Sequence, residues 1–137
     1  MLGEFFFCDA GELDETLLAG GPSGRHAVVT AKGLGPVEIA TLGRILAAGS
    51  YHDLFEASAS EHQEAESGES GVVGVPVSVC AALIDTADLV GVAEEWAATE
   101  ELRMSRWQSS DALDVLKELT RLVQSRAGKP VWYWWSL

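Results

Sequence analysis

The two ends of the chain carry its most apolar runs, and these runs limit the folds open to it. Near the N-terminus Phe5, Phe6 and Phe7 precede Cys8, and near the C-terminus stands the run Val131-Trp132-Tyr133-Trp134-Trp135. Short apolar runs are typical of buried strands, and an exposed run of this kind would form a large apolar patch. We therefore predict two interior strands that pair with each other. Alternation along the second would send Trp132 and Trp134 to one face of the sheet, and Tyr133 and Trp135 to the other.

Helical signals dominate the chain between these strands. Apolar residues recur at helical spacing, and capping residues, Pro or Gly stand where such helices would begin or end. The predicted helices cover about 11–19, 36–48, a short stretch after Ser50, 76–84, 87–102 and 110–126, and further strands cover 26–30 and 72–75. A chain of 137 residues fits one domain. We expect a single α+β domain over 1–137, with about five helices against a short, mostly antiparallel sheet that includes both terminal strands.

The segment 56–71 differs from the rest of the chain. It contains five Glu, no Lys or Arg and no large apolar side chain. Such a segment buries too little apolar surface to offset the entropy lost on ordering. We predict a mobile acidic loop inside the domain.

The overall charge argues against several classes of function. The chain has 9 Lys and Arg against 21 Asp and Glu, a formal net charge of −12. Nucleic-acid binding needs clustered cations, so no DNA or RNA partner is expected. The longest apolar runs fall far short of the ~20 residues that span a bilayer, and no basic leader precedes the first apolar run. We expect a cytoplasmic protein with no membrane partner.

The cysteines and histidines form no recognisable motif. Cys8 and Cys80 are expected to be buried, reduced thiols, although a disulfide between them is an alternative. Cys8 and His26 would form a thiol–imidazole pair if their strands met, but the neighbouring acid Asp9 would raise the pKa of the thiol. His62 lies among acids in the predicted loop, which would not hold ligands at fixed distances. No catalytic residue, metal ligand or cofactor is therefore predicted.

The uneven distribution of charge is the most informative feature for function. Residues 1–102 contain 18 acids and 3 bases, a net charge of −15, whereas 103–137 contain 3 acids and 6 bases, a net charge of +3. Clustered carboxylates steer a protein toward a cationic partner and make the association specific. We expect them to form one continuous docking surface. Glu94, Glu95, Glu100 and Glu101, on one predicted helix, would make the contacts, and the loop residues Glu61, Glu64, Glu66 and Glu69 would steer the approach.

The expected function is that of a small acidic module that binds a basic protein. Inhibitors of nucleases use this physics, because a nuclease needs cations to hold phosphate. The chain is similar in size and charge to the immunity proteins that neutralise bacterial toxins, a likeness of physical type that no motif supports. Two other functions stay open. One is a small enzyme or ligand-binding protein with a pocket between sheet and helices, near Cys8, His26 and the C-terminal aromatic residues. The other is a homo-oligomer, such as a homodimer, in which the Trp-rich strand extends a sheet.

Overall fold

The two apolar ends of the chain pair directly, as the sequence predicts. In the computed structural model, which describes residues 2–137, β1 (Leu2–Phe7) runs antiparallel to β5 (Val131–Ser136), with Phe5 opposite Tyr133. β5 also pairs with β4 (Ser70–Val75), and the two-residue strands β2 (Val29–Thr30) and β3 (Gln63–Glu64) complete the edges. The five strands form one antiparallel sheet in the order β2-β1-β5-β4-β3.

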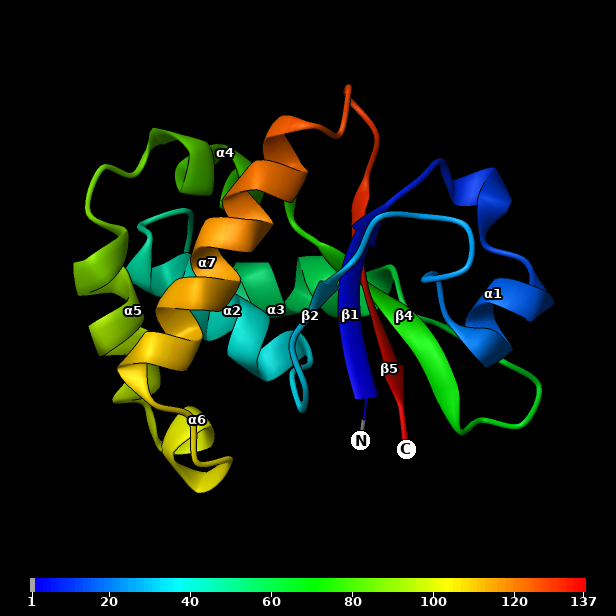
Figure 1. The fold of residues 1–137 in the computed structure, drawn as a ribbon, viewed down its shortest axis with the longest axis horizontal. Coiled ribbons are helices and arrows are strands. Elements are labelled where there is room, and N and C mark those ends of the chain that lie inside the picture. The colour runs from blue at the N-terminus through cyan, green and yellow to red at the C-terminus, as the bar shows by residue number, and fades with distance from the viewer. Residues whose placement is uncertain (1) are drawn as a thin grey trace.

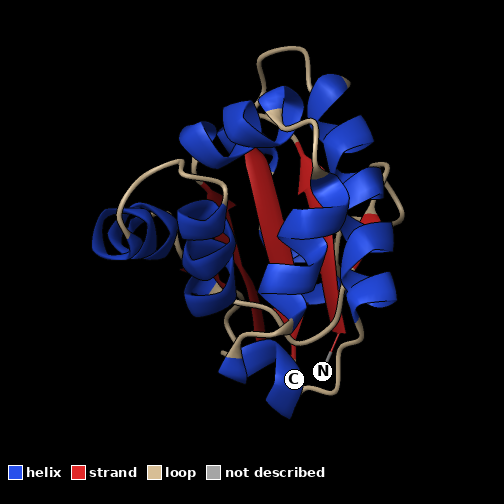
Figure 2. Ribbon diagram, turned by 90° about the vertical axis from the view of Figure 1, so that its left-hand side faces the viewer, coloured by secondary structure: helices blue, strands red, loops and turns tan. Residues whose placement is uncertain are grey.

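Six α-helices cover one face of this sheet and a seventh lies on the other. Among residues 2–137 the helices are η1 (Ala10–Glu12, a 3-10 turn), α1 (Glu15–Gly20), α2 (Pro36–Ile45), α3 (Tyr51–Ser60), α4 (Val77–Asp85), α5 (Leu89–Ala97), α6 (Glu100–Met104) and α7 (Ser109–Gln124). In Figure 1, α2 to α7 lie on one side of the strands and α1 on the other. Figure 2, viewed from the α5 side, shows helices in front of the strands. The α+β class is therefore confirmed, with seven α-helices in residues 2–137 where about five are expected.

Each face of the sheet has its own apolar core. The larger core joins Phe5 and Tyr133 of the sheet to side chains from α2 to α7, including Trp96 and Leu116. The smaller core lies under η1 and α1 and contains Phe6, Cys8, Leu13, Leu17, Leu18, Ala65, Val72, Trp132 and Trp134. Alternate residues of β1 and β5 contribute to the two cores. The period-two pattern of these strands therefore determines which side chains pack in each core.

The Trp-rich strand β5 is divided between the cores as its alternation predicts. Trp132 and Trp134 face the smaller core, and Tyr133 and Trp135 face the larger one. The indole nitrogens of Trp132 and Trp134 donate hydrogen bonds to the backbone carbonyls of Cys8 and Leu18. β5 has a hydrogen-bonded neighbour on each side. It has no free edge, so the expected route to a homodimer, in which this strand extends a sheet, is not open.

The acidic segment 56–71 is not the loop expected from its composition. Its first residues complete α3, and the rest form a hairpin of β3, a turn and the start of β4. The buried Ser58 hydroxyl donates to the carbonyl of Gly74, and the buried Ser70 hydroxyl donates to that of Leu18. Small side chains thus order this segment by hydrogen bonds, which an estimate of apolar burial alone leaves out.

Two predicted helices are each divided in two. The helix expected over 11–19 is the η1 turn followed by α1, because Asp14 caps a new helix by accepting from the backbone N–H of Leu17. The helix expected over 87–102 is α5 followed by α6. α5 ends at Ala97, and Thr99, in an extended conformation, is the N-cap residue of α6. The Thr99 hydroxyl donates to the carbonyl of Trp96, a local bond of the kind that competes with helix continuation. Glu94 and Glu95 therefore lie on a different helix from Glu100 and Glu101.

None of the helices described is both long enough and apolar enough to cross a membrane.

Candidate functional site

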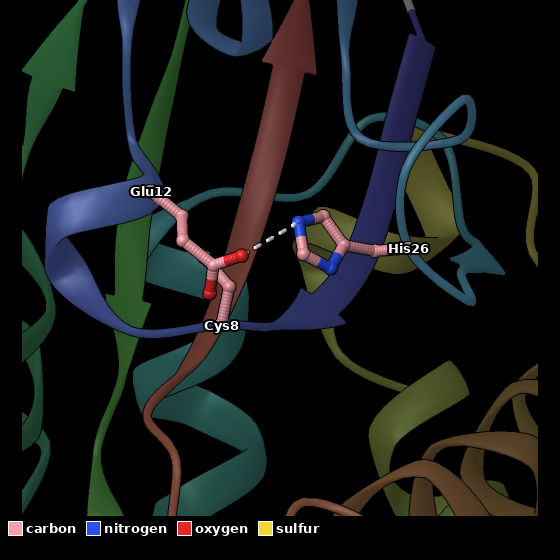
Figure 3. A group of neighbouring side chains, drawn as sticks. All are labelled: Cys8, Glu12 and His26. Atoms are coloured by element: carbon pink, nitrogen blue, oxygen red, sulfur yellow. Dashed lines mark ion pairs between the residues drawn. The ribbon is translucent and has the colours of Figure 1, made fainter.

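Three side chains of the kinds that bind metals or catalyse reactions meet beside α1. They are Cys8, which follows β1, Glu12 of η1, and His26, which precedes β2 (Figure 3). One ligand atom from each lies within 4.8 Å of the others. Cys8 is fully buried, whereas Glu12 and His26 are half-buried, so the cluster lies at the border between the smaller core and solvent.

Backbone hydrogen bonds hold the cysteine and the histidine in place. The N–H of Cys8 donates to the carbonyl of Pro130 at 3.2 Å, which continues the pairing of β1 with β5. The N–H of His26 donates to the carbonyl of Pro22 at 2.9 Å and closes a turn. The next residue back, Arg25, binds the carboxylate of Asp14 through two hydrogen bonds of 2.8 and 3.1 Å. The turn that carries His26 is thereby tied to the start of α1.

The Glu12 carboxylate has two separate environments. Its Oε2 accepts a hydrogen bond of 3.0 Å from the N–H of Asp9, which forms a capping box around η1. Its Oε1 lies 3.8 Å from Nε2 of His26, which is beyond hydrogen-bond distance. Nε2 is buried, and among the described residues it has no hydrogen-bond partner. The capping box therefore aims the second oxygen of Glu12 at an imidazole nitrogen that lacks a partner.

The thiol of Cys8 is not activated as a nucleophile. Burial, and then the nearby carboxylates of Glu12 and Asp9, raise its pKa to about 11 against the smaller lowering effects of Arg25 and Lys129. Catalytic cysteines have a lowered pKa and an electropositive surrounding. In a catalytic triad the nucleophile and the acid also use opposite nitrogens of the imidazole. Here Glu12 faces Nε2 of His26 across 3.8 Å, too far for the hydrogen bond by which a triad acid orients the ring (Figure 3).

The sequence predicts part of this cluster. Cys8 and His26 are considered as a thiol–imidazole pair from the sequence but are not predicted as a site, and the structure brings them together. Glu12 is missed, because its position predicts only a first-turn residue of a longer helix. The spacing of Asp9 and Glu12 matches a capping box, and that signal would have placed the Glu12 carboxylate back toward Cys8. Cys80 is also a buried free thiol, but it belongs to the larger core.

The predicted contact residues of α5 and α6 face outward. Glu94, Glu95 and Glu100 are exposed and Glu101 is half-buried. None of these four forms an ion pair within the part of the chain described. We call them the α5–α6 carboxylates.

The predicted steering residues lie elsewhere. Glu61, Glu64, Glu66 and Glu69 are exposed and surround the β3–β4 hairpin; we call them the hairpin carboxylates. This hairpin contacts α1, where the N–H of Glu66 donates to the carboxylate of Glu15 at 2.9 Å. In Figure 1, α1 and α5 lie at opposite ends of the long axis. The expectation of one continuous acidic surface is therefore not met, because the two groups lie toward opposite ends of the long axis.

A hollow of about 360 Å³ lies between the sheet and the helices, on the larger-core side of β5. Its lining is mostly apolar and consists of Leu34, Gly35, Pro36, Ala59, His62, Val73 and Trp135. The rings of His62 and Trp135 are stacked, with centroids 6.2 Å apart, and His62 Nε2 lies 3.2 Å from Glu64 Oε1. The hollow lies between sheet and helices and includes the C-terminal aromatic residue Trp135, as expected for a pocket, but Cys8 and His26 do not line it.

No protein-family model, curated protein or solved structure matches this chain. Its function is therefore inferred from the geometry above.

Proposed function

We propose that the protein binds a basic protein partner through the end of the molecule formed by α5 and α6. The observation that carries this proposal is the set of α5–α6 carboxylates, three exposed and one half-buried, which have no ion-pair partners among the described residues. Carboxylates held on helices are presented at little cost in conformational entropy, whereas ordering a loop on binding would weaken the complex.

The local sequence keeps this end of the molecule negative. From Val77 to Leu102 the chain contains six acidic residues and no Lys, Arg or His. The first cation beyond it, Arg103, lies on α6 itself. Unpaired carboxylates grouped in this way produce a potential that accelerates encounter with a cationic surface.

Exposed apolar side chains accompany the carboxylates. Val90 is 52% exposed and lies one helical turn before Glu94, and Met104 is 78% exposed and lies one turn after Glu100. Residues four apart on a helix are neighbours on one face. Each helix therefore offers an apolar contact beside a carboxylate, and interfaces combine contacts of these two kinds in an apolar centre with a polar rim.

A basic toxin or nuclease is the partner class that this surface fits best, with the protein acting in the cytoplasm as its inhibitor or immunity protein. An enzyme that holds phosphate must present cations, and an inhibitor that covers them needs carboxylates without internal partners. The size and charge of the chain support this proposal, and the division of acids between two ends limits the contact surface to α5 and α6.

The test compares two variants with equal changes in charge. One replaces Glu94, Glu95, Glu100 and Glu101 with Gln, and the control replaces Glu61, Glu64, Glu66 and Glu69 with Gln. A partner captured by the wild-type protein is identified, purified and measured for its association rate over a range of salt concentrations. We expect the partner to be a basic protein whose association rate with the wild-type chain falls as the salt concentration rises. The α5–α6 variant should associate at least tenfold more slowly than the wild type, and the control variant should lose much less.

Two results would contradict the proposal. One is an association rate that does not change with salt, and the other is an equal loss of rate in both variants. Far-ultraviolet circular dichroism of both variants provides the check on folding.

The hollow between the sheet and α2–α3 supports a second candidate, a protein that binds a small ligand. Its volume of about 360 Å³ lies within the range of small-molecule sites. The stacked rings of His62 and Trp135 would offer an aromatic wall to such a ligand. The protein-binding proposal is preferred because this hollow holds few polar groups that would converge on a substrate.

A further inference from the structure

The cluster of Cys8, Glu12 and His26 has a feature that packing alone does not explain. Nε2 of His26 is buried and lacks a hydrogen-bond partner among the described residues, although Glu12 Oε1 faces it at 3.8 Å. A buried polar nitrogen normally finds a partner. Two groups that face each other at slightly too long a distance are the arrangement expected when an ion binds between them.

The ligand atoms lie within a small adjustment of the spacing found among ligands that share one zinc ion. Tetrahedral zinc with Zn–N and Zn–O bonds of about 2.0–2.1 Å separates N from O by about 3.3 Å, and a Zn–S bond of about 2.3 Å separates S from N by about 3.6 Å. The three ligand atoms here lie within 4.8 Å of one another. Rotation of the Glu12 side chain, which is 41% exposed, is enough to bring its oxygen closer.

The ligand types select the metal. A thiolate and an imidazole favour zinc over magnesium or calcium, which prefer oxygen ligands. One thiolate and one carboxylate also balance the charge of Zn²⁺, so the bound site adds no net charge to the edge of the smaller core. The carboxylates of Asp9 and Glu12 already make the surroundings of Cys8 negative.

We propose that Cys8 Sγ, Glu12 Oε1 and His26 Nε2 bind one Zn²⁺ ion, with a fourth position open to solvent beside Glu12. On binding, the Cys8 thiol loses its proton to solvent and the sulfur donates an electron pair to the metal. Three protein ligands and one open position are the arrangement of catalytic rather than purely structural zinc sites. The ion would also join the loop after β1, η1 and the turn before β2 into one unit.

The chain contains a matched control for this site. His62 and Glu64 also place an imidazole nitrogen beside a carboxylate, at 3.2 Å, but among the described residues no cysteine joins that pair. A surface His–Glu pair of this kind binds metal weakly. Substitution of His62 therefore reports any binding that does not depend on Cys8.

The experiment titrates the reduced, chelator-treated full chain with Zn²⁺ against a coloured chelator, and separately with Co²⁺ as a spectroscopic probe. We expect one ion per chain and a thiolate-to-cobalt charge-transfer band. Glu12→Gln and His26→Gln are each expected to weaken Zn²⁺ binding more than about 100-fold, because even residues that only support a ligand change affinity about 10- to 100-fold. Cys8→Ser should remove the charge-transfer band, and His62→Gln should change nothing.

The proposal fails if the wild-type chain takes up no Zn²⁺, or if Co²⁺ binds without the charge-transfer band. It also fails if His62→Gln weakens binding as much as His26→Gln does. Because Cys8 is fully buried, Cys8→Ser is open to an effect on folding. Glu12→Gln is the decisive variant, because Glu12 is partly exposed and Gln can keep the hydrogen bond to Asp9.

This site is separate from the surface proposed for partner binding. Cys8 belongs to the smaller core, whereas Trp96 of α5 and Leu102 of α6 belong to the larger core across the sheet. Loss of zinc binding and loss of partner binding are therefore expected in different variants, and failure of one proposal leaves the other to be tested.

Discussion

At the scale of single residues, the buried hydroxyl of Tyr133 links the sheet to the loop before α2. It donates to the carbonyl of Ala31 and accepts from the N–H of Leu34 at 3.1 Å. Its ring packs edge-on against Phe5, with centroids 4.8 Å apart. Gly3 makes room for this hydroxyl, because a Cβ atom at Gly3 would overlap the Tyr133 oxygen.

We predict that Gly3→Ala lowers the free energy of unfolding by about 3 kcal/mol, the upper part of the range for overpacking a filled site. Denaturation in urea measures the change. Gly11→Ala is the control, since a Cβ atom there would meet no atom within 4 Å, and it should stay within about 0.5 kcal/mol. In the double variant Gly3→Ala/Tyr133→Phe the loss should be smaller than the sum of the single losses; a stable Gly3→Ala variant would contradict the close approach.

Tyr133 also predicts how stability changes in alkali. Burial raises the pKa of its phenol from 10.0 to about 12. As the pH rises from 10 to 12, the unfolded chain releases this proton while the folded chain keeps it, so deprotonation favours unfolding. The stability present below pH 10 should fall by about 2 to 3 kcal/mol.

Comparison with Tyr133→Phe isolates this effect from other groups. The free energy of unfolding of both proteins is measured against pH, and the difference between them should shrink above pH 10. A constant difference would show that the phenol does not titrate differently in the folded and unfolded chains.

At the scale of elements, the positions of helices and strands are largely predictable, and their breaks are not. The helix that carries Leu116 and Leu119 and the strand β5 have strong periodic patterns that survive in the fold. Thr99 and Asp14 begin new helices that the periodicity does not reveal. Both residue types also occur inside longer helices, so local preference is too weak to decide between a continuous helix and a new cap.

We predict that the short helix α1 depends on its cap. It has six residues, too few for stability in isolation, and Asp14 accepts from Leu17 N–H at 2.9 Å. Asp14→Ala should lower the free energy of unfolding by about 0.5–2 kcal/mol. Asp14→Asn should cost much less because Asn also caps helices and the ion pair with Arg25 is exposed and worth little. Thermal unfolding measures both, and an equal loss in the two would show that the ion pair matters more than the cap.

At the scale of the whole molecule, the sheet separates two chemistries. The cluster of Cys8, Glu12 and His26 lies beside α1 on one face, and the α5–α6 carboxylates lie beyond the helices of the other. Of the hairpin carboxylates, Glu66 lies beside α1, whereas Glu64 lies on the same face of the sheet as Trp135. One acidic protein thus has two acidic ends, which a count of charges along the chain cannot distinguish.

The sequence by itself determined that the apolar ends pair in the interior, which face each aromatic residue of β5 occupies, and that most of the acids are exposed. These features follow from period and polarity, which act between neighbours in the chain. Only the tertiary structure decided that the acids form two separate groups and that Glu12 joins Cys8 and His26. Such arrangements depend on the path of the backbone through turns at Pro22 and Asp14, where small differences in hydrogen bonding redirect whole elements.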